Sequence, residues 1–313
     1  MPTNIKVAKS PKEIDDVFRI RHQVFVEEEQ MLSDNNDGRL LDHFDAMPTT
    51  SNLIVVDEGQ VIGSMRMSID CEIGLPADSY YDFRSILPKD AVIMHCGMFC
   101  ISNQYRDPKI TSGLLLMASY FAMSKKITHV VAPINPKIAK LVQRIGFKKV
   151  GEEFIEPNLN HAMLPLVMAL ADMNDYFLGF VKKNQLQDFL GDYERSFFKK
   201  GEYIVRAGEE GRYAYLIVSG SAEARLADVN QKIGELHEGE LFGELALLTD
   251  EVRSADIVAI TDLQVMTLSK AVFTYHFYNR PEHTEKLLKL MGKRTQLMIS
   301  QLAQLKAELD VQT

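Results

Sequence analysis

The run from Phe242 to Ala255, FGELALLTDEVRSA, combines residue types that together can hold an anion. Gly243 lets the backbone approach a ligand closely because it has no Cβ atom. The apolar turn beginning at Glu244 indicates a short helix, whose first amides point toward a phosphate, and Arg253 adds a forked, permanently charged donor. The pattern predicts a phosphate pocket. The alternative is a buried helical turn in which Glu244 and Arg253 form a solvated ion pair.

Short alternating segments punctuated by glycines surround this run and must position it. Turn glycines stand at Gly201, Gly208, Gly211 and Gly220, and Gly234 and Gly239 bracket a further short segment. Strands are predicted at Tyr203–Arg206, Tyr213–Val218, Ala222–Leu226, Asp256–Ile260 and Leu263–Leu268. Many short strands joined by tight turns predict an antiparallel all-β roll.

This combination resembles a cyclic-nucleotide-binding domain over roughly residues 183–275. The resemblance implies that Arg253 holds the cyclic phosphate and that Glu244 accepts the ribose 2′-hydroxyl. It favours cyclic AMP as the effector over cyclic GMP, although Ser254 can donate to a guanine as well. The residues it implies in nucleotide binding are Phe242, Gly243, Glu244, Leu245, Ala246, Arg253, Ser254 and Ala255.

Length and composition bound the rest of the chain. The 313 residues allow two domains of ordinary size. A net charge of −8 without a Lys/Arg cluster argues against a nucleic-acid partner. No apolar run is long enough for a membrane span, and the start lacks a basic and apolar signal region, so we expect a cytoplasmic protein. Cys71, Cys96 and Cys100 are predicted to be reduced thiols. His95 beside Cys96 and Cys100 could suggest a metal site, but no second pair of ligands accompanies them, so no metal is expected.

The first half alternates predicted helices and strands. Ser10, Pro11 and Glu13 have the pattern of a capped helix start, and the helix is predicted to run to about Glu28. The polar segment Ser33–Gly38 then breaks the pattern. The following elements are a hairpin of Asn52–Val56 and Val61–Ile69, a strand at Ala91–Ile101, a helix at Ile110–Lys125, a strand at His129–Ile134, a helix from Asn135 to Ile145 and a strand at Gly146–Phe154. This order predicts an α/β sandwich.

Three short motifs carry a second resemblance. They are IRHQVFVE around Arg21 and Phe25, DHFD with Asp42 and Asp45, and GSMR ending at Arg66. Together with the element order they resemble the superfamily of the Gcn5-related N-acetyltransferases, and within it the autoinducer synthases and N-acyl amino acid synthases. The resemblance implies transfer of an acyl group from a thioester to a small amine such as an amino acid, with Arg21, Phe25 and Arg66 binding the substrate.

The loop from Arg106 to Gly113 is implied to hold the acyl donor. It has one late glycine, whereas a pyrophosphate cradle needs several bare amides. A single phosphate therefore fits better, which favours the phosphopantetheine arm of an acyl-carrier protein, with acyl-coenzyme A as the alternative donor. The implied donor-binding residues are Arg106, Ile110, Thr111, Ser112, Gly113 and Asn135.

N-acylation needs a base that takes a proton from the amine. His95 is the predicted base because imidazole titrates near neutrality, and Asp45 and Asp42 are the further catalytic candidates. The alternatives are a histidine packed in the sheet and two acids that pair with the motif arginines. Autoinducer synthases carry Glu-x-Ser-Arg where this chain has His95 to Met98, so the lactone-forming reaction is not implied.

The sequence predicts a domain order of 1–163 for the acyltransferase, 164–190 for a helical connector, 191–275 for the nucleotide domain and 276–313 for terminal helices. Leucines and methionines at three-four spacing in Glu285–Leu309 indicate a lid helix or a homodimer contact. The predicted function is a cyclic-nucleotide-regulated N-acyltransferase. A protein lysine acyltransferase and an inactive nucleotide-binding signalling protein are the alternatives, and the direction of regulation stays open.

Overall fold

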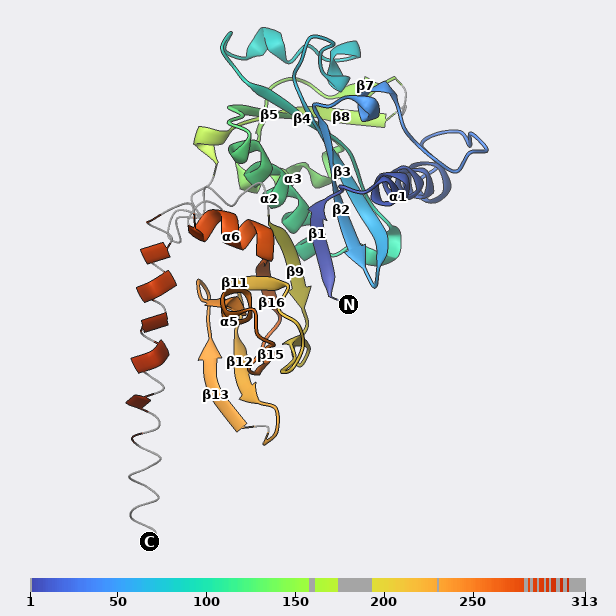
Figure 1. Ribbon diagram of the computed structural model, residues 1–313. Helices are drawn as coiled ribbons and strands as arrows, with labels where there is room; N and C mark the ends of the chain where they lie inside the picture. The colour runs from blue at the N-terminus through green and yellow to red at the C-terminus, as the bar shows by residue number, and fades with distance from the viewer. Residues whose placement is uncertain are drawn as a thin grey trace.

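The computed structural model describes residues 2–157, 161–173, 193–229 and 231–278, together with single positions between 281 and 303. These residues form two parts, an α/β part and an all-β part (Figure 1). One sheet runs through both parts in the order β14-β11-β16-β9-β1-β2-β3-β4-β5-β8-β6, with β7 beside β8. The two parts are therefore hydrogen-bonded to each other through their strands.

The first part is the predicted α/β sandwich. Its elements are β1 (Thr3–Val7), α1 (Pro11–His22), β2 (Thr50–Asp57), β3 (Gln60–Ile69), β4 (Ile93–Ile101), α2 (Pro108–Ser124), β5 (His129–Ile134), α3 (Pro136–Ile145), β6 (Lys148–Lys149), β7 (Phe154–Glu156) and β8 (His161–Ala169). Along β2, Ile54 packs with Val17 of α1, whereas Leu53 packs with Leu114 of α2. Because neighbouring strand residues point to opposite faces, α1 covers one face of the sheet and α2 the other.

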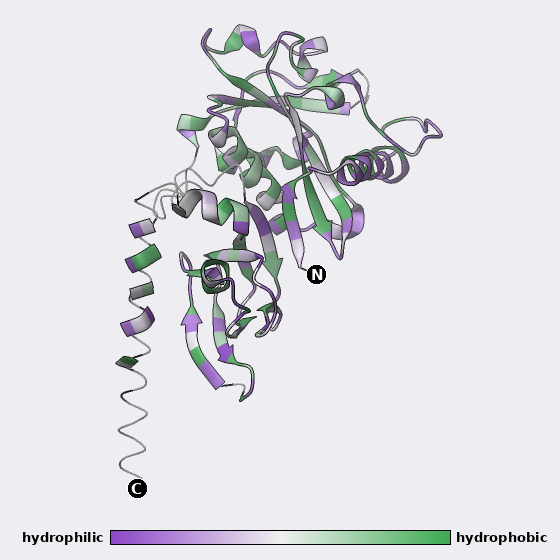
Figure 2. Ribbon diagram, viewed as in Figure 1, coloured by the Kyte–Doolittle hydropathy of each residue, from purple (hydrophilic) through white to green (hydrophobic). Residues whose placement is uncertain are grey.

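Local sequence signals explain where the helices begin. The hydroxyl of Ser10 accepts from the Glu13 amide at 3.2 Å and Glu13 accepts from the Ser10 amide at 2.9 Å, so the predicted capping box is confirmed. Asn135 caps α3 by accepting from the Lys137 amide at 3.0 Å. Figure 2 shows α1 as largely hydrophilic and α2 as more hydrophobic, which agrees with a surface position for α1 and a buried one for α2.

Two expectations about the end of this part were wrong. Gly146–Phe154 is not one strand, because β6 holds two residues and β7 begins at Phe154. Leu164–Ala169 is not helical, because it belongs to β8, which pairs antiparallel with β5. Residues 174–190 of the predicted connector lie outside the described residues.

The second part is the predicted antiparallel roll. Its elements are β9 (Glu194–Phe198), β10 (Tyr203–Val205), β11 (Tyr213–Ser219), β12 (Ala222–Leu226), β13 (Gln231–Leu236), β14 (Leu241–Phe242), α5 (Glu244–Thr249), β15 (Asp256–Ala259), β16 (Leu263–Ser269) and α6 (Lys270–Tyr278). A four-stranded sheet in the order β10-β15-β12-β13 faces the long sheet. Ile217, Phe242 and Val265 are among the buried side chains packed between them.

The two parts meet where β1 lies between β2 and β9. Ile5 of β1 is in register with Val55 on one side and with Arg195 on the other, and both pairings are antiparallel. Helix α2 packs over this junction. A Cβ atom on Gly113 would lie 2.8 Å from Ile5 Cδ1 and 3.0 Å from Phe197 Cζ, so α2 approaches both parts closely.

The terminal segment continues as helix at its described positions between 281 and 303. Leu287 is buried, whereas Leu288 and Ile299 are exposed. The predicted homodimer contact of this helix stays a prediction. Among the described residues, no helix has the length and apolar character that crossing a membrane requires.

Candidate functional site

A split in the sheet creates the main cavity of the first part. Strands β4 and β5 pair in parallel from Ile93–His129 to His95–Val131, and their ladder ends there. A cavity of about 480 Å³ opens beyond this point and is lined by β4 from Cys96 to Ile101. Met98 adopts a φ of 47° in this stretch, which marks an irregular strand. The backbone of β4 on the side of β5 is thereby left available to a ligand.

The cavity is lined from both faces of the sheet. Val24, Phe25 and Met31 contribute from the α1 side, and Leu115 and Ala118 contribute from α2. The lining is mostly apolar, as an acyl-chain site requires. The predicted substrate residue Phe25 is therefore at the cavity.

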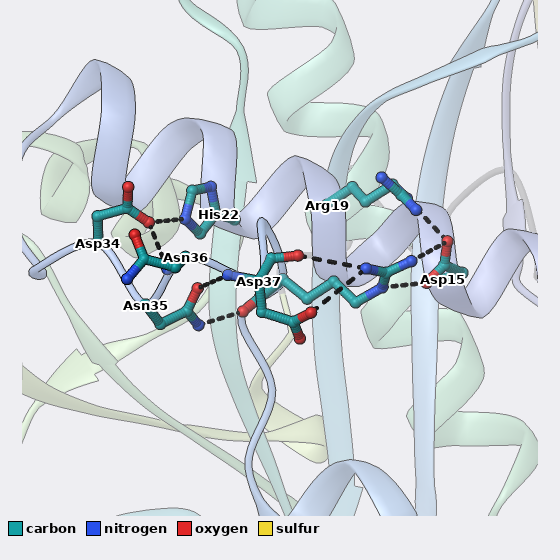
Figure 3. Close-up of polar contacts among 8 residues, drawn as sticks. Asp15, Arg19, His22, Asp34, Asn35, Asn36 and Asp37 are labelled. Carbon is teal, nitrogen blue, oxygen red and sulfur yellow. Dashed lines mark hydrogen bonds and ion pairs between the residues drawn. The ribbon is translucent and has the colours of Figure 1, made fainter.

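The segment after α1 is tied to that helix by charged contacts (Figure 3). Arg39 Nε donates to Asp15 at 2.6 Å, and His22 lies with one ring nitrogen 3.1 Å from Asp34. Both contacts anchor the chain just after Met31 to helix α1. Met31 packs against the cluster of Ile20, Val24 and Phe25 beside the cavity.

Helix α2 begins at one end of the cavity. Three of the six predicted donor residues line the cavity, namely Arg106, Thr111 and Asn135. The other three, Ile110, Ser112 and Gly113, do not line it. Asp107 caps α2 by accepting from the Lys109 amide at 2.7 Å.

Arg106 is held in place at this entrance by two contacts. Its Nε donates to the carbonyl of Ile101 at 3.1 Å, and its terminal nitrogen pairs with Glu29. Both Arg106 and Glu29 line the cavity. An incoming phosphate would therefore compete with Glu29 for the same guanidinium group.

His95, the predicted base, lies outside the cavity lining. Its ring is 2% exposed and packs over Gly97, and neither ring nitrogen has a hydrogen-bond partner among the described residues. Burial, and to a lesser degree the charge of Arg66, lowers the pKa of His95 to about 3. The imidazole is therefore neutral at pH 7 and a weak base. The catalytic role of His95 stays a prediction that this placement does not support.

The motif arginines and acids form one ionic cluster on the α1 side of the sheet. Arg21 donates to Asp45 at 2.8 Å and to Asn52 at 2.6 Å. Arg66 donates to Asp42 at 2.7 Å and to Asp45 at 3.1 Å. This is the structural pairing that the sequence left open as an alternative. The cluster lies outside the cavity lining, and the catalytic and substrate-binding roles of its members stay predictions.

Exposure separates the two acids of this ionic cluster. The side chain of Asp45 is 1% exposed, whereas that of Asp42 is 35% exposed. Burial pushes the pKa of Asp42 upward, but the hydrogen bond and charge of Arg66 outweigh it, so this pKa lies below its usual range. Asp45 is thus the acid enclosed between two guanidinium groups.

Sequence reasoning missed a histidine that does line the cavity. His161 begins β8 and is half-buried, and Met163, two residues on, lines the same cavity. Residues two apart on a strand share a face, which explains why both reach it. No motif surrounds His161, and β8 was predicted to be helical from Leu164 onward, so the sequence offered no signal for it.

In the second part, the residues predicted to bind the nucleotide lie around Gly243. This glycine has a φ of 75°, a left-handed conformation that favours glycine, and it precedes α5. Arg253 is 7% exposed and donates to the carbonyls of Gly243 at 2.5 Å and of Tyr213 at 2.6 Å. Burial lowers the pKa of Arg253 below its usual range. Within the described part of the chain, no acidic side chain forms an ion pair with this guanidinium group.

Glu244, the predicted ribose acceptor, is 1% exposed and already has a cationic partner. Arg294 of the terminal helix pairs with its carboxylate and also donates to the carbonyl of Leu241. The terminal helix thus contacts Glu244, the residue predicted to accept the ribose hydroxyl. Phe242 and Ala246 are buried beside it, whereas Leu245 and Ser254 are exposed.

Comparisons with known proteins agree with this division. Residues 16–169 match the family model described as N-acyl amino acid synthase FeeM, and residues 195–276 match the cyclic nucleotide-binding domain. Both resemblances seen in the sequence are thereby confirmed.

Individual relatives match parts of the chain. A cAMP-dependent protein kinase regulatory subunit of Colletotrichum orbiculare is 38% identical over 103 residues, which are 30% of this chain and 26% of that protein. The chain spans 26% to 32% of the length of the kinase regulatory subunits that it matches.

Solved structures align with each half. The structure of FeeM, an N-acyl amino acid synthase from uncultured soil microbes, aligns with a TM-score of 0.48 and 16% identity over 55% of this chain and 95% of that chain. The Thermus thermophilus catabolite activator protein aligns with a TM-score of 0.34 and 28% identity over 36% of this chain and 55% of that chain.

Proposed function

Because the chain carries an N-acyl amino acid synthase domain followed by a cyclic nucleotide-binding domain, we propose that it is a cyclic-nucleotide-regulated N-acyltransferase. Its substrates are an acyl thioester and a small amine such as an amino acid. The observation that carries this proposal is the apolar cavity at the split between β4 and β5, which is lined from both faces of the sheet. An acyl chain and an amine can then approach the same thioester from different sides.

The entrance of the cavity suits the phosphopantetheine arm of an acyl-carrier protein. Arg106 offers a guanidinium group to one phosphate, whereas the first turn of α2 offers no row of free amides, because Pro108 lacks an N–H and the Lys109 amide donates to Asp107. The unpaired backbone of β4 beyond His95 can hold the amides of the arm. Acyl-coenzyme A carries the same arm and remains the alternative donor.

The effector of the second part is a cyclic nucleotide, and cyclic AMP is favoured. The kinase regulatory subunits that match this part are cAMP-dependent. The buried Arg253, which has no acidic partner among the described residues, offers a charge for the cyclic phosphate. A ribose hydroxyl would meet Glu244 where Arg294 now pairs with it.

A direct assay tests the proposed function. The full-length protein is incubated with a long-chain acyl-pantetheine thioester and the standard amino acids, and thiol release and acylated product are measured. We expect cyclic AMP to change turnover about five- to hundredfold, since allosteric coupling is typically about 1–3 kcal/mol. Thiol release without an N-acyl product, or no turnover with carrier-bound, coenzyme A and pantetheine donors alike, would refute the proposal.

The structure offers a route for this regulation. Helix α2 lines the acyl cavity with Thr111 and Leu115 and packs on β1 and β9 at Gly113. Lys109 in its first turn pairs at 2.8 Å with Asp262, which belongs to the turn between β15 and β16. A shift of the nucleotide domain therefore acts on the helix that borders the donor.

Removing this ion pair should weaken the coupling. We expect Asp262→Asn to leave nucleotide affinity unchanged and to reduce the nucleotide effect on turnover by up to about fivefold, because ion pairs between exposed side chains are weak. The asparagine can still accept from the Lys200 amide, as Asp262 does. The matched control is Asp16→Asn, which removes a surface partner of Lys12 away from the junction. Equal regulation in both variants would exclude this pair from the route.

A further inference from the structure

The proposed reaction requires a proton acceptor at the cavity itself. A substrate amine is largely ammonium at neutral pH, and its lone pair must be freed before it attacks the thioester carbon. Three of the described cavity-lining residues are carboxylates or imidazoles, the side-chain types that commonly act as general bases, namely Glu29, Asp107 and His161. Their existing contacts decide among them.

Two of these three side chains already have polar partners. Glu29 pairs with Arg106, and Asp107 caps α2 through the Lys109 amide. For His161 the structure shows no hydrogen bond or ion pair with another described side chain. Its ring is half-buried, so it can pass a proton on to solvent.

The sheet places His161 at the open end of the split. Leu164 of β8 is in register with Ile134, the last residue of β5, so His161 lies three residues beyond the end of that strand. Asn135 and Lys137 at the start of α3 line the same end of the cavity. An amine entering here meets the imidazole before it reaches the unpaired side of β4.

We infer that His161 is the catalytic base of the proposed acyl transfer, in place of His95. The inference rests on the proposed function. The unprotonated ring nitrogen takes a proton from the ammonium group, and the freed lone pair forms the new C–N bond at the thioester carbonyl. The adduct loses a second proton, the C–S bond breaks, and the thiolate leaves with its electron pair. One proton ends on the thiol and one in solvent.

Two nucleophiles distinguish a base from a structural histidine. The full-length protein, His161→Gln and His95→Gln are assayed with the standard amino acids and with hydroxylamine, which is already neutral at the assay pH. We expect His161→Gln to lower turnover with amino acids by about 10²–10⁴-fold, as for loss of a general base, and to change turnover with hydroxylamine by less than about tenfold. His95→Gln should stay within a few-fold of the unsubstituted protein with both nucleophiles.

Binding of an unreactive acyl-pantetheine thioether, measured by calorimetry, reports whether each variant keeps its cavity. Full turnover of His161→Gln with amino acids overturns the inference and leaves the proposed function intact. An equal loss with both nucleophiles also overturns it, because it assigns His161 a positioning role. If the unsubstituted protein acylates neither nucleophile, the proposed function fails and the inference fails with it.

Discussion

Replacing Arg253 by alanine is expected to weaken cyclic-nucleotide binding by about one to two orders of magnitude. A hydrogen bond to a charged group contributes about 1.5–3 kcal/mol, and each 1.4 kcal/mol is tenfold in affinity. Arg253 is buried beside Gly243, and no acidic side chain of the described chain neutralises it. Calorimetric titration with cyclic AMP and with cyclic GMP measures the loss and also identifies the preferred nucleotide.

Two further variants define the specificity of this result. Arg253→Lys keeps the charge but loses the fork that reaches two carbonyls, so we expect an intermediate affinity. Arg206→Ala removes an exposed arginine that stacks 3.9 Å from the ring centre of Tyr203 in the same part, and it should bind normally. If Arg253→Ala unfolds at the same temperature as the unsubstituted protein and binds the nucleotide with unchanged affinity, the assignment of Arg253 to nucleotide binding is contradicted.

Replacing Asp45 by alanine is expected to lower the free energy of unfolding by about 3–5 kcal/mol. The change leaves Arg21 without its charged partner in a fully buried position, and removing one partner of a buried ion pair costs this much. Urea unfolding followed by circular dichroism measures it, since the chain has no tryptophan for fluorescence. Asp42→Ala is the matched control. Its side chain is partly exposed and Arg66 keeps Asp45, so about 1 kcal/mol is expected.

The same pair of variants separates structure from catalysis. The ionic cluster of Arg21, Asp42, Asp45 and Arg66 can hold α1 to the sheet. If this is its main role, Asp45→Ala should lower the free energy of unfolding, while the folded variant keeps its substrate affinity. If it binds the amine instead, Asp42→Ala should raise the KM for the amine while unfolding stays unchanged. A stable Asp45→Ala variant would refute the structural assignment.

Elements with local signals were predictable from the sequence. The capping box at Ser10 and the caps at Asn135 and Gly243 each depend on neighbouring residues, and the structure has all three. Five strands of the roll were predictable because their residues alternate between short turns. The boundary expected at Gly234 was wrong, because β13 runs through this glycine, and β9 and β14 were not predicted as strands.

Features that depend on distant pairing were not predictable. β8 is a short apolar run with little alternation, and such a run has the same composition in a buried strand and a buried helix. His95 is buried in a strand that pairs on both sides, with β3 and with β5, and neither pairing is encoded within its own segment. His161 reaches the cavity because β8 extends past the end of β5. The residue spacing within β8 does not encode this extension.

The pairing of β1 with β9 has a consequence for each half on its own. Cut apart, the acyltransferase half would expose the outer side of β1, and the nucleotide half would expose β9. An open sheet edge is a template for strands of other molecules and hence for aggregation. In the intact chain β1 and β9 pair with each other, so each domain covers the sheet edge that the other would otherwise expose to aggregation.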